Sequence, residues 1–163
     1  MEDFKKLQKK NGNLYHFDIP EDYELLDWDL PLFQQSRQVQ EKLKSMLNSL
    51  AQMGFSGSNI YKKAFFSQLG GIDITQGRAG NITGGMLYQN IMDFMKQEIL
   101  KTLSPEQARE AFINHDKNIL PEAKVRTSQI FNEFGIPGHK FLDKSKTGSH
   151  NFVIWNTDKI KMT

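Results

Sequence analysis

Apolar residues recur at intervals of three and four along much of the chain, which is the spacing of one face of an α-helix. The clearest case is residues 34–53, whose apolar positions are Val39, Leu43, Met46, Leu47, Leu50 and Met53. Gly54 follows directly and is a typical C-terminal stop. The same pattern predicts further helices over 59–69 and 85–102, and two more that begin at about 104 and 121. The sequence therefore predicts about five helices.

Alternation of apolar and polar residues, which is typical of strands, is confined to the two ends of the chain. Residues 13–19 alternate, and Pro20 ends the pattern because proline cannot donate to a sheet ladder. After a helix stop at Gly135, the C-terminal part predicts a short strand, a buried strand at 151–155 and a strand-like tail at 158–161. The predicted fold class is α+β, with a small, mainly antiparallel sheet built from the two chain ends and about five helices packed on it.

The length of 163 residues is that of one domain. Residues 1–12 are polar and lysine-rich, and we expect a flexible basic N-terminus there, followed by a single domain over 13–163. The net charge of +2 is too small to indicate direct binding of nucleic acid. Cysteine is absent, which excludes disulfides and a thiol nucleophile and suits a reducing cytosol, so the expected location is the cytoplasm. No apolar run is long enough to span a membrane.

Residues 21–33 form a long connection between the first strand and the first helix that is both acidic and aromatic, and we call it the acidic segment. The acidic residues from 18 to 29 are Asp18, Glu21, Asp22, Glu24, Asp27 and Asp29, with no lysine or arginine among them. Three interpretations are open: a solvated acidic loop, a calcium site that lacks the usual ligand spacing, or a surface that docks on a partner. For the last, the predicted contact residues are Tyr23, Asp27, Trp28, Asp29 and Phe33.

Candidate catalytic residues are few. The glycine-rich stretch 77–85, which contains Arg78, has neither of the common phosphate-loop patterns, and no two histidines have metal-ligand spacing. Ser149 and His150 are neighbours on a predicted strand, so their side chains face opposite ways. Asp143 is a lone carboxylate before the last strands. These patterns predict no metal site and no visible set of nucleophile and base.

Several blocks together resemble a module of large phage and mobile-element proteins. The blocks are Asn13–Leu32, Ile82–Tyr88, Phe134–Asp143, Ser149–Trp155 and Asp158–Lys161. In Mu head-associated and large polyvalent proteins, that module is similar to an ADP-ribosyltransferase. The resemblance implies the C-terminal part of such a module, without the N-terminal strands that hold NAD. It therefore implies a truncated, transferase-like domain that lacks half of its cofactor cleft.

Two functional hypotheses follow from this resemblance. The first is a non-catalytic phage or mobile-element protein that binds a host protein and needs no cofactor, for example an inhibitor of a host defence system such as an anti-CRISPR protein. The second is an active mono-ADP-ribosyltransferase that uses NAD, with Asp143, His139 and Arg78 as its candidate catalytic residues. Self-association is a further expectation, because a shortened sheet leaves a strand edge open.

Overall fold

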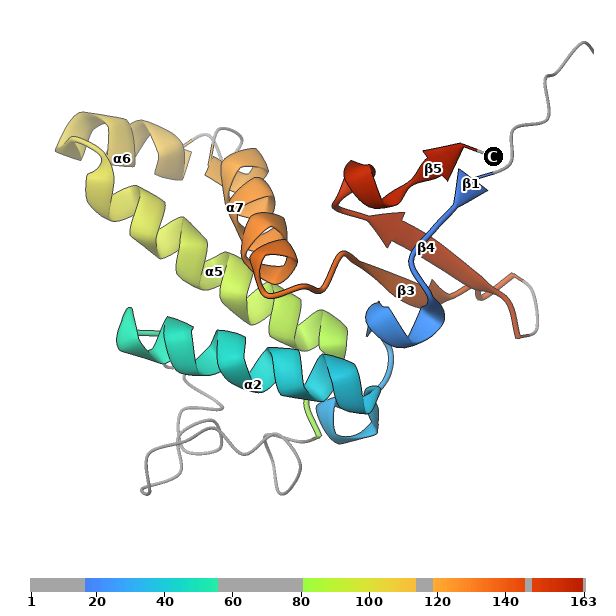
Figure 1. Ribbon diagram of the computed structural model, residues 1–163. Helices are drawn as coiled ribbons and strands as arrows, with labels where there is room; N and C mark the ends of the chain where they lie inside the picture. The colour runs from blue at the N-terminus through green and yellow to red at the C-terminus, as the bar shows by residue number, and fades with distance from the viewer. Residues whose placement is uncertain (1–16, 56–80, 114–118, 146–147, 163) are drawn as a thin grey trace, which may run out of the picture.

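The computed structural model describes residues 17–55, 81–113, 119–145 and 148–162. In these residues a helical half and a small sheet lie side by side, and the acidic segment joins them (Figure 1). The α+β class is therefore confirmed. The described residues hold four α-helices rather than about five, and the helix predicted over 59–69 lies outside them.

The four helices begin and end close to the predicted positions. They are α2 (Arg37–Gln52), α5 (Gly84–Thr102), α6 (Pro105–Ile113) and α7 (Ile119–Glu133). Ser36 caps α2, since its hydroxyl accepts from the amide of Val39. Before α6, Ser104 and Gln107 bond each other's backbone amides. These caps satisfy amides that have no partner inside the helix, so they fix where each helix starts.

The three-stranded sheet has the order β2–β3–β4. Its strands are β2 (Leu26–Asp27), β3 (Gly138–Leu142) and β4 (His150–Ile154). β3 and β4 are antiparallel, but β2 runs parallel to β3. The prediction of a mainly antiparallel sheet is wrong because β2 comes from the acidic segment, and all four described helices intervene before the chain returns as β3.

The two chain ends meet as predicted. β1 (Phe17–Asp18) pairs antiparallel with β5 (Lys161–Met162), which places Asp18 opposite Lys161. Three short 3-10 helices complete the described elements: η1 (Asp22–Glu24), η2 (Leu32–Gln34) and η3 (Thr157–Lys159). η1 lies within the acidic segment, and η2 lies at its end.

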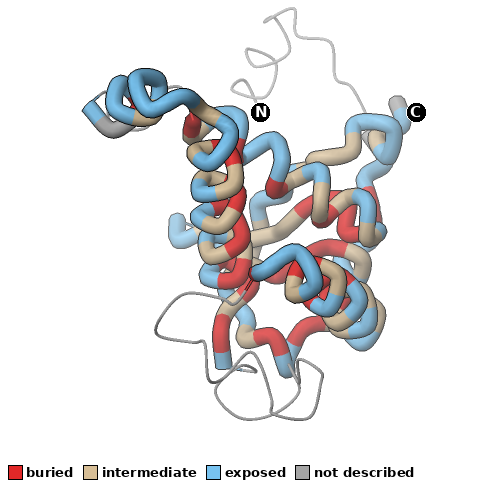
Figure 2. Tube along the Cα trace, turned by 90° about the vertical axis from the view of Figure 1, so that its left-hand side faces the viewer, coloured by how far each residue is buried: buried red, intermediate tan, exposed pale blue. Residues whose placement is uncertain are grey.

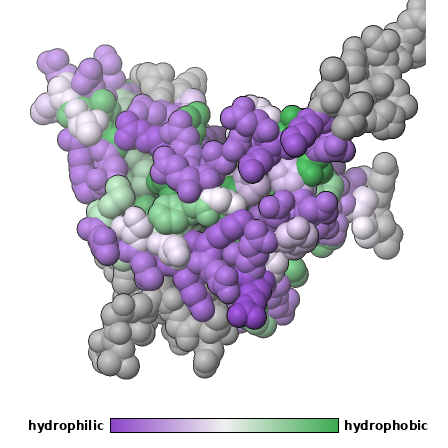
Figure 3. All heavy atoms as spheres, viewed as in Figure 1, coloured by the Kyte–Doolittle hydropathy of each residue, from purple (hydrophilic) through white to green (hydrophobic). Residues whose placement is uncertain are grey.

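The core lies where α2, α5 and α7 face one another and the sheet (Figure 2). Leu43, Leu47, Leu87, Ile91 and Phe131 are completely buried there. The periodic apolar positions of α2 form its buried face, except for Met53 at its C-terminal end, which is exposed. The buried residues of α5 follow the same helical spacing. On the face shown in Figure 3, hydrophilic side chains predominate and apolar ones reach the surface in small groups, the largest of them over the helices. Within the described residues, no helix has the length and apolar character needed to cross a membrane.

Candidate functional site

The acidic segment is held by one buried side chain, the amide of Gln35. Its Oε1 accepts from the amide of Asp27 at 2.8 Å, and its Nε2 donates to the carbonyls of Asp27 and Leu30 at 2.7 and 2.9 Å. The Asp27 carboxylate in turn accepts from the amides of Asp29 and Leu30, both at 3.1 Å. Asp27 is only 7% exposed. Its carboxylate therefore shapes the loop rather than facing a partner.

The segment also packs against the start of α5. The amides of Gly84 and Gly85 donate to the carbonyls of Leu30 and Trp28. A Cβ atom at Gly84 would lie 2.2 Å from the carbonyl oxygen of Asp27, and one at Gly85 would lie 2.4 Å from the indole of Trp28. Both distances are far below van der Waals contact, so the close approach of helix and segment requires glycine at these two positions.

Two aromatic side chains of this segment remain at the surface. Tyr23 is 57% exposed and Phe33 is 41% exposed. Their backbones are nevertheless held, since the Ser36 hydroxyl donates to the carbonyl of Tyr23 and Gln40 Nε2 donates to the carbonyl of Phe33. The structure thus presents two rings on a fixed backbone.

The five predicted contact residues therefore differ in their exposure to solvent. Tyr23, Asp29 and Phe33 are exposed, and the Asp29 carboxylate accepts from the amide of Leu142 at 2.8 Å. Asp27 is buried, and Trp28 is half-buried against Tyr88 and His139. We call Tyr23, Asp29 and Phe33 the contact surface below. Asp27 orders the loop that carries Asp29, because its carboxylate accepts from the amides of Asp29 and Leu30.

Opposite charges from the two chain ends also meet beside this surface. The Lys140 ammonium lies 3.3 Å from the Asp22 carboxylate and 4.0 Å from that of Asp27, and only 16% of the lysine side chain is exposed. Two carboxylates of the acidic segment are therefore paired with a lysine of β3 inside the molecule.

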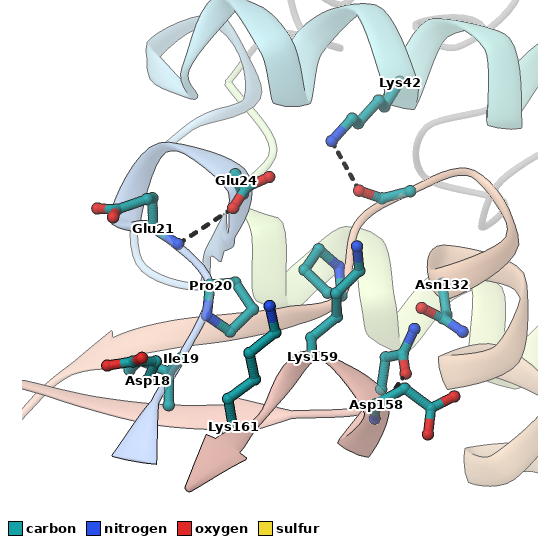
Figure 4. A pocket seen from close by; sticks show the side chains of 13 residues that line it. Asp18, Ile19, Pro20, Glu21, Glu24, Lys42, Asn132, Asp158, Lys159 and Lys161 are labelled. Carbon is teal, nitrogen blue, oxygen red and sulfur yellow. Dashed lines mark hydrogen bonds between the residues drawn. The ribbon is translucent and has the colours of Figure 1, made fainter. Parts of the chain in front are cut away.

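A cavity of about 740 Å³ lies next to the segment (Figure 4). Its charged lining combines three lysines, Lys42, Lys159 and Lys161, with four carboxylates, Asp18, Glu21, Glu24 and Asp158. One of the lysines, Lys42, donates to the carbonyl of Gly135 at 2.7 Å. Because both signs of charge line the same space, the cavity does not select an anion or a cation by charge alone.

The first candidate catalytic residue, His139, lies among aromatic rings. Its ring centroid is 4.5 Å from that of Trp28, 5.2 Å from that of Trp155 and 6.0 Å from that of Phe141. Burial without a compensating charge lowers the pKa of His139 to about 4. Its Nδ1 atom is buried and has no hydrogen-bond partner within the described residues. The imidazole is therefore neutral at neutral pH and packs as part of the aromatic cluster.

The second candidate, Asp143, is hydrogen-bonded to a residue of its own loop. Its carboxylate accepts from the amide and the hydroxyl of Ser145 at 2.8 and 2.6 Å, and these bonds lower its pKa. The third candidate, Arg78, lies outside the described residues. No hydrogen bond joins His139 to Asp143 in the part of the chain that the structure describes. In that same part, no group of three acidic or histidine side chains is placed to hold a metal ion.

The sequence did not identify the residues that hold the acidic segment in place. Gln35 could not be recognised, because a single glutamine before a helix is common and has no pattern that indicates buried hydrogen bonds. The Gly84–Gly85 pair after the capping Thr83 was the best available sign, since small residues at a helix start permit a close neighbour.

The chain matches no family model, no curated protein and no solved structure.

Proposed function

We propose that this chain is a non-catalytic binding protein of a phage or mobile element, which grips a host protein in the bacterial cytoplasm and needs no cofactor. The contact surface of Tyr23, Asp29 and Phe33 makes the contact. The observation that supports this function is the pair of exposed aromatic rings on a segment whose backbone is fixed by side-chain hydrogen bonds. The resemblance to phage and mobile-element modules suggests that the partner is a component of a host defence system.

Exposed aromatic residues are the side chains that interfaces use most effectively. They bury a large area at a small cost in rotamer entropy, and they are enriched among the few residues that dominate binding energy. A fixed backbone reduces this cost further, because little of the loop has to be ordered on binding. The hydrogen bonds of Ser36, Gln35 and Gln40 therefore matter for affinity as well as for folding.

The charges around the rings favour a basic partner. Glu24 is adjacent to Tyr23 in the chain, Glu21 precedes Tyr23 by two residues, and Asp29 is exposed between the two rings in sequence. One oxygen of Asp29 is occupied by the amide of Leu142, which leaves the other free to accept from an arginine or lysine. Complementary charge of this kind sets the rate and specificity of association more than the final affinity.

The test compares three forms of the protein as bait in a bacterial lysate. The first is wild type, the second carries Tyr23→Ala with Phe33→Ala, and the third carries Met53→Ala with Val125→Ala. The control pair is matched, because Met53 and Val125 are also exposed apolar residues, at 62% and 56%. We expect one host protein to be retained by wild type and by the control, and to be lost from the Tyr23/Phe33 variant. Equal melting temperatures of the three forms show that folding is intact.

Equal retention of that host protein by all three forms would contradict the contact surface. A functional assay adds a second arm: expression in a bacterium with an active CRISPR system should raise the plating efficiency of a targeted phage. The Tyr23/Phe33 variant should not have this effect, and the control variant should.

Incubation with NAD and the captured host protein separates binding from catalysis. The neutral, packed His139 and the occupied Asp143 favour binding without transfer. Mass spectrometry should therefore find no ADP-ribose added to the partner. A modified partner, with the modification lost in Asp143→Ala, would replace this proposal with the transferase.

A further inference from the structure

β4 is an edge strand of the three-stranded sheet. It pairs with β3 along its whole length, and no strand pairs with its other side among the described residues (Figure 1). Residues 151–153 are all exposed. An open strand edge of this kind presents backbone groups that are able to pair with a further strand.

The hydrogen bonds at the two ends of β4 show which backbone groups point outward. The carbonyl of Ser149 accepts from Asp143, and the amide of Trp155 donates to Pro137, so both of these odd-numbered residues face β3. Because neighbouring residues in a strand alternate, the amides and carbonyls of His150, Phe152 and Ile154 point to the open side. No other hydrogen bond within the described residues occupies them.

The side chains of this edge suit a second copy of the same strand. Phe152 is 40% exposed and Val153 is 39% exposed, and consecutive strand residues lie on opposite faces, so both faces offer an apolar group. No charged residue occurs from 149 to 157. Charges and proline are the usual protections of a natural edge strand, and a copy of this strand would meet neither.

We propose that two copies of this chain associate through their β4 edges, antiparallel and about a two-fold axis at Phe152. In this register Phe152 lies opposite Phe152 of the second copy, and His150 lies opposite Ile154. These three outward pairs form about six backbone hydrogen bonds. The two sheets become one continuous sheet, in which β4 is no longer an edge. The contact surface of Tyr23, Asp29 and Phe33 takes no part, so this inference does not depend on the proposed function.

The two-fold axis gives a sharp test, because position 152 faces itself. Wild type should shift from the monomer mass of 18.8 kDa to twice that value as concentration rises from micromolar to millimolar in light scattering. Phe152→Lys and Phe152→Glu should each remain monomeric, since each sets two like charges opposite one another. An equimolar mixture of the two should recover the doubled mass. Val125→Lys, which places a charge on an exposed residue of α7, should dimerise like wild type.

A second measurement holds even where a variant at 152 folds poorly. In wild type, the amide of Phe152 should exchange with deuterium rapidly in dilute solution and slowly in concentrated solution, whereas the amide of Val153 should be protected in both. A constant mass of 18.8 kDa over the whole concentration range overturns the inference. So does dimerisation that survives Phe152→Lys, or a mixture of the two charged variants that stays monomeric.

Discussion

At the scale of single residues, the candidate catalytic residue His139 packs within a cluster of aromatic side chains. Its imidazole lies against Trp28 and Trp155, where water does not solvate a charge well. Protonation is therefore disfavoured in the folded protein, and the pKa falls from 6.5 to about 4. A catalytic acid at neutral pH needs a pKa near that pH, which His139 does not have.

This lowered pKa predicts a loss of stability in mild acid. The unfolded chain takes up a proton near pH 6.5, whereas the folded chain resists it down to about pH 4. The free energy of unfolding should thus be fully present above pH 6.5 and should decline as the pH falls from 6.5 towards 4. Urea titrations across this range measure the decline. His139→Phe should flatten the profile, because it removes the buried imidazole that resists protonation. A wild-type profile that is flat between pH 6.5 and 4.5 would contradict the burial of a neutral imidazole.

At the scale of elements, the acidic segment is stable because Gln35 holds it from one side and the start of α5 holds it from the other. Removing the Gln35 amide leaves the buried amide of Asp27 and the carbonyls of Asp27 and Leu30 without this partner. Each buried polar group that loses its partner costs about 1–3 kcal/mol. Gln35→Ala should therefore lower the free energy of unfolding by about 2–4 kcal/mol.

Gln34→Ala is the matched control, because Gln34 is the neighbouring residue and is exposed, and its side chain makes no hydrogen bond that orders the segment. It should change stability by less than about 0.5 kcal/mol. Urea denaturation followed by circular dichroism measures both variants. The result to watch is the difference between them: equal values would show that the Gln35 amide does not hold the segment.

Helices were the part of the fold that the sequence predicted well. The periodicity of α2 and α5 and the capping residues Ser104 and Gln107 act locally, so their effect is visible in a short window. β2 was missed for the opposite reason. It has two residues, both buried, and its partner β3 lies beyond all four described helices. Parallel pairing between such distant segments leaves no local pattern to recognise.

The candidate site was predictable in outline only. The sequence indicated an acidic, aromatic surface, and Tyr23 and Phe33 are indeed exposed. It did not separate Asp27 from Asp29, because two aspartates in one loop look alike until the partner of each is known. Asp27 turns inward to the loop amides, and Asp29 reaches the amide of Leu142 on a strand distant in sequence.

At the scale of the whole molecule, the helical half and the sheet are joined through one aromatic cluster. Phe131 of α7 is completely buried, and its ring lies 5.2 Å from that of Trp155 and 5.6 Å from that of Tyr88 on α5. The rings of Trp28 and His139 continue the cluster to β2 and β3. Since the same side chains contribute to both halves, neither half buries its apolar surface without the other.

This shared cluster predicts that the two halves unfold together. Both tryptophans of the chain, Trp28 and Trp155, lie in the cluster, so their fluorescence reports on it, while far-ultraviolet circular dichroism reports mainly on the helices. In urea the two signals should change with one midpoint, measured where the protein is monomeric. Phe131→Ala should lower both midpoints by the same amount, equivalent to about 3–5 kcal/mol, because it opens a cavity where α5, α7 and the sheet meet. Val125→Ala, an exposed change on the same helix, should move neither by more than about 0.5 kcal/mol. A helical signal that outlasts the fluorescence signal in urea would instead mean that the helices form a separate folding unit, on which the sheet is only docked.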